Sequence, residues 1–169
     1  DYLLERNLQE LRAVVRELWE ELAQSRFQPA GFEVQFGPGG AMPPVEIPGG
    51  AMPAQLRGFV DRLDLYERDG QTYVRVVDYK TGRKDFDYCD VLNGLGLQML
   101  LYLFALEDHG RAYLGVSAEA AGVLYFPARA AVLPVEGPVE PQEARLLRQK
   151  EARRKGLLLL DEDVLQAMD

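Results

Sequence analysis

Cysteine, histidine and long apolar runs are scarce in this chain of 169 residues. It has one cysteine, Cys89, and one histidine, His109. A single cysteine excludes an internal disulfide, and it excludes a four-cysteine zinc site or iron–sulfur cluster held by this chain alone. Such cysteine usage favours a reducing, cytoplasmic setting. The longest apolar run, residues 99–106, is too short to span a bilayer, so we expect no membrane association.

Positive charge is also scarce. The chain has 27 acidic and 19 basic residues, for a formal net charge of −8. This balance argues against a protein that coats nucleic acid non-specifically, although a local basic groove stays open. Its length and composition fit one globular domain with a real core. The chain begins with Asp1, and we interpret it as part of a longer protein, with an N-terminal helix (1–25), a core (32–135) and a C-terminal helical segment (140–169).

Apolar periodicity and turn signals predict both helices and strands. Leucine and valine recur at threes and fours in residues 2–24, which predicts an amphipathic helix, with Leu4, Leu8, Leu11, Val15, Leu18 and Leu22 on its apolar side. We expect strands at 32–36, 55–67, 72–79, 121–126 and 130–135. Further helices are expected at 94–107, at 141–155 and after a cap at Asp161. This order predicts an α/β or α+β fold, a central mixed sheet flanked by helices.

A hairpin turn sets the register of the two longest strands. The dipeptide Asp69-Gly70 is a strong signal for a two-residue turn. Counting outward from that turn, Asp61 faces Asp78, and Asp64 on the opposite side of the sheet faces Arg75. We interpret Asp64 and Arg75 as a structural ion pair. Because side chains alternate, one face of the hairpin should carry Phe59, Asp61, Leu63, Leu65, Val74, Val76, Asp78 and Lys80.

Asp61 and Asp78 would then lie side by side at the edge of an apolar patch. Directly opposed side chains have Cβ atoms about 4.5–5.5 Å apart, and two ionised carboxylates that close repel each other. Lys80 supplies one compensating charge, and a divalent cation bound by carboxylate oxygens would supply the second. Such a site can activate water against a phosphodiester. The alternatives are a solvated strand end, pairing of both aspartates with arginines, or a bulge that breaks the register.

Three segments, in this order, resemble the PD-(D/E)XK nuclease superfamily: "GFVDRLD", "VVDYKTG" and "GLQMLLYL". Within it, the chain is similar to the C-terminal nuclease domain of the B subunit of bacterial AddAB-type helicase–nucleases, which are relatives of RecB. The resemblance implies a restriction-endonuclease-like core with Asp61, Asp78 and the Tyr79 carbonyl as ligands of Mg²⁺ or Mn²⁺. It also implies that Lys80 is the catalytic lysine.

The resemblance extends to a helix motif and to a basic loop. Gln98 and Tyr102 match the motif beside the family's site, and the alternative is a buried pair that satisfies its own hydrogen bonds. Arg83 and Lys84 could contact DNA phosphates, or they could belong to a solvated loop. Family members usually have an upstream histidine or glutamate that reaches the metal. Here His109 lies downstream, and Glu33 is a candidate third ligand.

The resemblance implies an exonuclease domain of a helicase–nuclease in double-strand-break repair, with DNA and a partner subunit as its partners. The related subunit usually has an iron–sulfur cluster, whose cysteines this chain lacks, so a cluster is possible only in the full-length parent. A competing interpretation is a catalytically inactive, nuclease-like module that binds DNA ends or a partner subunit. Another is an unrelated α+β interaction domain. We expect the isolated chain to fold but to cleave DNA poorly.

Overall fold

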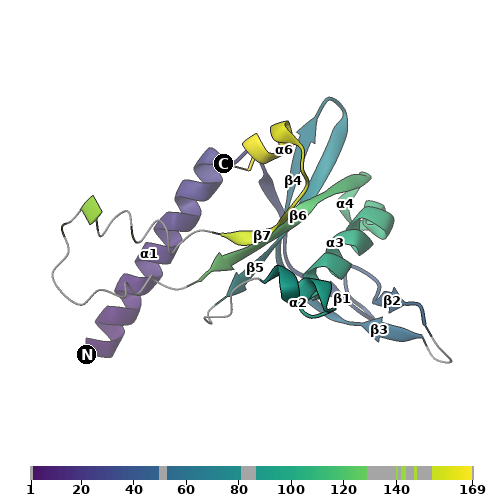
Figure 1. The fold of residues 1–169 in the computed structure, drawn as a ribbon, viewed down its shortest axis with the longest axis horizontal. Helices are drawn as coiled ribbons and strands as arrows, with labels where there is room; N and C mark the ends of the chain where they lie inside the picture. Colours follow the sequence, from purple (N-terminus) through teal and green to yellow (C-terminus); the bar gives the residue numbers. More distant parts are fainter. Residues whose placement is uncertain are drawn as a thin grey trace.

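The centre of the computed structural model is a five-stranded sheet with the strand order β1-β4-β5-β6-β7 (Figure 1). The structure describes residues 2–49, 53–80, 87–128, 140, 142–143, 147 and 154–168. β5 and β6 are parallel, and the other neighbours in this sheet are antiparallel, so the predicted mixed sheet is confirmed. The strands are β1 (Gln28–Phe36), β4 (Gly58–Arg68), β5 (Gln71–Lys80), β6 (Ala118–Pro127) and β7 (Lys155–Leu158). A second sheet pairs β2 (Val45–Ile47) with β3 (Ala54–Leu56).

Helices lie on both sides of the central sheet. They are α1 (Tyr2–Gln24), α2 (Tyr88–Leu92), α3 (Gln98–His109), α4 (Arg111–Leu114) and α6 (Glu162–Gln166). Met99, Leu103 and Leu106 of α3 pack into the main core with Val74 and Val76 of β5. Among the helices that the structure describes, none is long and apolar enough to cross a membrane.

The hairpin between β4 and β5 has the predicted register. Asp69 and Gly70 form the turn with φ angles of +53° and +81°. Left-handed angles at both positions are what a type I′ turn requires, and Asp-Gly adopts them at low cost. Leu63 therefore pairs with Val76, as predicted. At the end of the hairpin away from the turn, the last pair is Arg62 with Val77, one position before Asp61 and Asp78.

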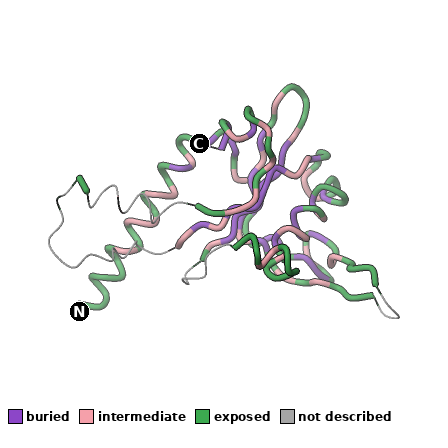
Figure 2. Tube along the Cα trace, viewed as in Figure 1, coloured by how far each residue is buried: buried purple, intermediate pink, exposed green. Residues whose placement is uncertain are grey.

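α1 has the predicted bounds, but its predicted apolar face is mostly uncovered. The exposed fractions of its residues include 59% at Leu4 and 54% at Val15. Of the predicted apolar residues, Leu18 packs against the sheet, together with Val14, which was not predicted. Glu21 is buried. Figures 1 and 2 show why: the N-terminal part of α1 extends past the sheet and is largely exposed. Among the described residues, only the C-terminal part of α1 packs against the sheet.

Other predicted helices and strands differ from the structure in their bounds, mostly near glycine or proline, and some short elements were not predicted. β1 begins at Gln28 rather than at 32, with an irregularity between Pro29 and Gly31 that hides the alternating pattern. α3 begins at Gln98 because residues 94 and 96 are glycines with positive φ. The predicted strand 55–67 is divided into β3 and β4, and β7 and α2 were not predicted. The strand at 130–135 and most of the helix at 141–155 lie outside the described residues.

The C-terminal helix begins as predicted. Asp161 caps α6, and its side chain accepts a hydrogen bond from the Val164 N–H at 3.0 Å. Arg68, at the end of β4, donates to the same carboxylate at 3.1 Å. The pKa of Asp161 is lowered, first by this hydrogen bond from Arg68 and then by the one from Val164. These contacts attach α6 to the hairpin, on the side of the sheet where Phe27, Tyr66 and Tyr73 pack.

Candidate active site

Asp78 and Lys80 lie together at the carboxyl end of β5. Asp78 is only 6% exposed, and its Oδ2 forms an ion pair with Lys80 Nζ. Lys80 Nζ also lies 5.7 Å from the centre of the Tyr125 ring on β6. The two residues are two positions apart on one strand, so their side chains share a face of the sheet. The shared face was predicted from the sequence, whereas the burial of Asp78 beside a partly exposed lysine was not.

Asp61 joins this site through a main-chain contact. Its Oδ2 accepts a hydrogen bond from the Tyr79 N–H at 2.7 Å. The main-chain pairing of β4 with β5 has already ended at this point. The Asp61 carboxylate therefore accepts the Tyr79 N–H in place of a main-chain carbonyl of β4. In the described part of the chain, neither Asp61 nor Asp78 is paired with an arginine, so that alternative is not observed.

The electrostatics of Asp78 follow from its burial and its neighbours. Burial raises the pKa of this carboxyl, the hydrogen bond and charge of Lys80 lower it, and the charge of Asp61 raises it again. The net pKa is raised, because burial outweighs Lys80. The pKa of Tyr125 is also raised, first by the burial of its own hydroxyl and second by the negative charge of Asp78. The charge of Asp61 therefore acts on Asp78, although the strand ladder ends one pair before the predicted pairing of these two residues.

The strand departs from simple alternation at Asp61. Val60 and Leu63 both belong to the main core, although they are three residues apart. Phe59 is 53% exposed, so the prediction that it shares the core face is wrong. The pairs on either side place Glu33 of β1 across from Asp61, and Glu33 has a φ of +47°. Such an angle is strained for a residue with a side chain, by about 1–2 kcal/mol.

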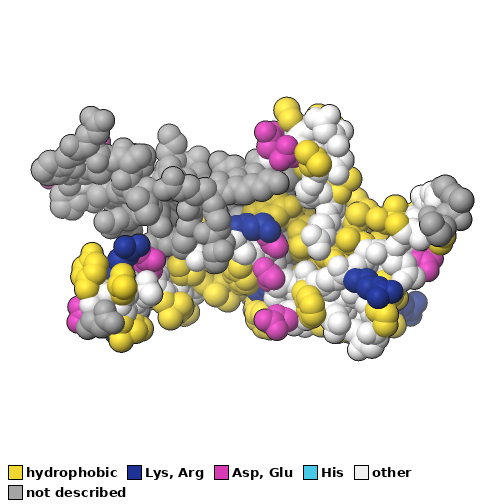
Figure 3. All heavy atoms as spheres, turned by 90° about the horizontal axis from the view of Figure 1, so that it is seen from below, with side chains coloured by type: hydrophobic (Ala, Val, Ile, Leu, Met, Phe, Trp, Pro, Cys, Tyr) yellow, Lys and Arg dark blue, Asp and Glu magenta, His cyan; other side chains and the backbone are white. Residues whose placement is uncertain are grey.

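Glu33 and Asp61 line one side of a surface cavity of about 540 Å³, with Phe32 and Tyr79. Figure 3 views the molecule from below, and acidic side chains gather beside a basic one near the middle of that face. Among the residues that the structure describes, however, no three aspartate, glutamate, histidine or cysteine side chains are grouped closely enough to hold a metal by themselves. Glu33 is thus near Asp61 without completing a set of three ligands.

Two observations fit a divalent cation at Asp61 and Asp78. The two carboxylates interact electrostatically, as described above, and both supply the hard oxygen ligands that Mg²⁺ and Mn²⁺ prefer. In addition, Asp78 is only 6% exposed, and Lys80 is the one cation that the described residues place within ion-pair range of it. A buried carboxylate is costly unless its charge is compensated, and a bound cation would add to the compensation that Lys80 gives.

Gln98 and Tyr102 of α3 form a hydrogen-bonded pair with each other. Gln98 Nε2 donates to the Tyr102 hydroxyl at 3.1 Å, and Tyr102 is fully buried. The Tyr102 ring stacks on Phe36 with ring centres 4.4 Å apart. The hydrogen bond fits the alternative of a pair that satisfies its own hydrogen bonds, but only Tyr102 is buried, because Gln98 is exposed. The pair lies against Gly58, where a Cβ atom would contact the Tyr102 hydroxyl.

The Gly58→Ala variant is expected to be less stable by about 1–3 kcal/mol, because overpacking a core contact forces side chains to move. Its new Cβ would also lie 3.1 Å from Gln98 Nε2. The measurement is urea unfolding followed by circular dichroism. Gly49→Ala is the control, because a Cβ there meets no atom within 4 Å. Equal stability of the two variants would contradict this close packing.

The remaining predicted residues lie elsewhere. Arg83 and Lys84 lie outside the described residues, so their contact with phosphates stays a prediction. His109 is exposed at the end of α3. Of the residues singled out from the sequence, the structure therefore brings together Asp61, Asp78, Tyr79 and Lys80, with Glu33 next to them across β1.

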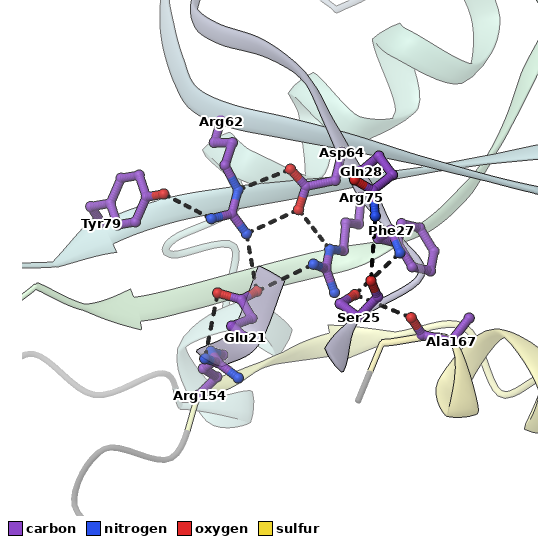
Figure 4. Close-up of polar contacts among 10 residues, drawn as sticks. All are labelled: Glu21, Ser25, Phe27, Gln28, Arg62, Asp64, Arg75, Tyr79, Arg154 and Ala167. Carbon is purple, nitrogen blue, oxygen red and sulfur yellow. Dashed lines mark hydrogen bonds and ion pairs between the residues drawn. The ribbon is translucent and has the colours of Figure 1, made fainter. Parts of the chain in front are cut away.

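A cluster of buried charges on the opposite face of the sheet was not predicted in full (Figure 4). Asp64 accepts from Arg75 Nε at 2.8 Å, which confirms the predicted ion pair, and also from Arg62 Nη2 at 3.0 Å. Glu21 of α1 accepts from Arg62 Nη2 at 3.0 Å and from Arg75 Nη2 at 3.2 Å. Arg154 lies 3.4 Å from the other oxygen of Glu21. We call Glu21, Arg62, Asp64, Arg75 and Arg154 the charge cluster.

The two central arginines of the charge cluster differ in their electrostatics. Burial lowers the pKa of Arg75 by more than Asp64 and Glu21 raise it. Burial also lowers the pKa of Arg62, but the negative charges of Asp64 and Glu21 raise it, and the net pKa is raised. Glu21 follows Val14 and Leu18 at helical spacing, but the sequence alone does not show that this face of α1 meets the sheet.

Comparisons with known proteins show the family of this chain. All of residues 1–169 match the PD-(D/E)XK nuclease superfamily. Curated relatives, named as B subunits of ATP-dependent helicase/deoxyribonucleases, are 44% identical in Symbiobacterium thermophilum, 39% in Moorella thermoacetica and 35% in Listeria monocytogenes. These matches cover 99%, 99% and 100% of this chain, but the chain spans only 15% of the length of each relative. The chain belongs to the PD-(D/E)XK nuclease superfamily.

Proposed function

We propose that this chain is the Mg²⁺- or Mn²⁺-dependent DNA nuclease domain of a bacterial helicase–nuclease. The observation that carries this proposal is the buried Asp78 beside Lys80, with Asp61 attached to the intervening Tyr79 main chain. The relatives are named as helicase/deoxyribonuclease subunits, and this supports deoxyribonuclease activity. Exonuclease action in double-strand-break repair is the more specific part of the proposal. DNA is the substrate, and a helicase–nuclease subunit is the protein partner. The location is cytoplasmic, where the exposed free Cys89 would stay reduced.

Asp61, Asp78 and the Tyr79 carbonyl would hold the cation, and Glu33 is the candidate for a further ligand. When bound, a divalent cation supplies Lewis-acid activation of water and neutralises charge on the phosphate. Lys80 Nζ is positioned to donate a hydrogen bond to the attacking water or to a phosphate oxygen. Its side chain is 46% exposed, so a DNA strand can reach it. Gln98 and Tyr102 of α3 are proposed as further catalytic residues, because they match the helix motif of the superfamily.

The Asp61→Asn and Asp78→Asn variants are each expected to bind Mn²⁺ at least about tenfold more weakly, measured by isothermal titration calorimetry. Loss of an outer-shell partner already costs about 10–100-fold in affinity, so loss of a ligand should cost no less. Asp108→Asn is the control, because this exposed aspartate on α3 has the same charge and lies outside the site.

The calorimetry also separates the proposed function from its main alternative. Binding of Mn²⁺ by both variants as by the unaltered chain would exclude this metal site. If the unaltered chain itself binds no Mn²⁺, the inactive module that contacts DNA ends or a partner subunit is favoured. Cleavage of linear duplex and single-stranded DNA with Mg²⁺ by the full-length protein, lost in Asp78→Asn, would establish the nuclease.

A further inference from the structure

Tyr79 connects the candidate metal site to the charge cluster on the other face of the sheet. Its main-chain N–H donates to Asp61 Oδ2 at 2.7 Å. Its side chain points to the opposite face, where the hydroxyl accepts from Arg62 Nη1 at 2.9 Å (Figure 4). One residue is thus attached at both ends, to a candidate metal ligand and to a buried arginine. A movement of its side chain would be transmitted to the main chain between Asp78 and Lys80.

Arg62 has little freedom to move. It is fully buried, and Glu21 and Asp64 accept hydrogen bonds from the nitrogen that does not contact Tyr79. Asp64 is in turn held by Arg75. A planar guanidinium group with fixed acceptors has one orientation available, and Arg62 therefore presents its remaining donor to Tyr79 in a set direction.

The end of β5 needs such support on the side of β4. The ladder between the two strands runs out at Arg62 and Val77, so Tyr79 has no main-chain partner on β4. On that side it is attached by the hydrogen bond to Asp61 and by the hydroxyl contact with Arg62. On the other side, Tyr79 pairs with Phe126 of β6, and the two rings pack edge to face with centres 5.4 Å apart.

We propose that Arg62, held by Glu21 of α1, is a positioning residue for the metal site. Through the Tyr79 hydroxyl it fixes the main chain that orients Asp61 and carries the proposed carbonyl ligand. The docking of α1 is thereby coupled to metal affinity, because Glu21 is the residue by which α1 enters the charge cluster. This inference rests on the proposed function and extends it to residues on the far face of the sheet.

The test compares two Tyr→Phe variants that remove one buried hydroxyl each. Tyr79→Phe keeps the ring contact with Phe126 but loses Arg62, and we expect Mn²⁺ affinity to fall about tenfold, as for other outer-shell partners. Tyr66→Phe is the control, because the Tyr66 hydroxyl is also buried and has no hydrogen-bonding partner among the described residues. Its Mn²⁺ affinity should be unchanged. Calorimetry gives both affinities, and thermal unfolding establishes that each variant is folded.

A second variant keeps the inference testable if Tyr79→Phe is unstable. Glu21→Gln retains the shape of Glu21 but weakens its hold on Arg62, so it should also lower Mn²⁺ affinity while Asp61, Asp78 and Tyr79 are intact. Wild-type affinity in Tyr79→Phe or in folded Glu21→Gln, with binding lost in Asp78→Asn, would overturn the positioning role alone. Wild-type affinity in Asp78→Asn would overturn the metal site and this inference with it.

Discussion

Lys80→Ala is expected to slow DNA cleavage by at least about 100-fold, in the range that a positioned proton-transfer or charge-stabilising group contributes. DNA binding should change little, because one hydrogen bond formed in the transition state adds little to ground-state affinity. Lys80 forms an ion pair with Asp78 and is partly exposed, so its removal leaves no cavity in the core. Cleavage is measured with Mg²⁺ on linear DNA by the full-length protein, and binding by fluorescence anisotropy without metal.

Arg111→Ala is the matched control for Lys80→Ala. It removes the same positive charge from α4, which follows the far end of α3 from Gln98. Cleavage by this variant should stay within about twofold of the unaltered protein, since a single exposed charge has little effect at a distance in salt. Cleavage by Lys80→Ala at the rate of the control would exclude the proposed role of the lysine.

Asp64→Ala is expected to lower the free energy of unfolding by about 3–5 kcal/mol, the cost of breaking a buried ion pair on one side. Arg62 and Arg75 are both fully buried and would lose the carboxylate that they share. Burial already lowers the pKa of Arg75 with Asp64 present, so the uncompensated charge would be costly. Because a whole domain is stable by only about 5–15 kcal/mol, this loss should be evident in urea unfolding followed by circular dichroism.

Glu10→Ala is the control for Asp64→Ala. Glu10 also forms an ion pair with an arginine, Arg6, at 3.0 Å, but both side chains are exposed on α1. Pairs of this kind contribute little to stability because water and salt screen them. A loss of stability in Asp64→Ala as small as in the control would mean that the buried arginines find other partners or water.

Much of the sheet and the family of the chain could be predicted from the sequence. The β4–β5 hairpin was predicted in its turn and register, because Asp69 and Gly70 specify a left-handed turn and strand residues alternate. Asp64 and Arg75 were paired on the same basis. The order of the acidic residues, the lysine and the helix motif indicated the superfamily, which the match over the whole chain confirms.

The geometry at the site was harder to predict, because it depends on departures from regular structure. The change of face between Val60 and Leu63 brings Val60 rather than Phe59 into the core, and alternation alone cannot show it. Glu33, with its left-handed main chain, lies across from this irregularity. Gly58 lets Gln98 and Tyr102 of α3 lie close to β4, a contact between segments far apart in the sequence.

The sequence alone determined the elements whose partners are close in the chain: the hairpin, the cap of α6 and the shared face of Asp78 and Lys80. Short-range turn chemistry and a period of two or 3.6 residues encode such neighbours directly. Only the tertiary structure decided that Glu21 of α1 meets Arg62, and that Arg62 in turn holds Tyr79. The side of α1 that packs on the sheet depends on where the whole helix docks, because its apolar residues cover more than one face.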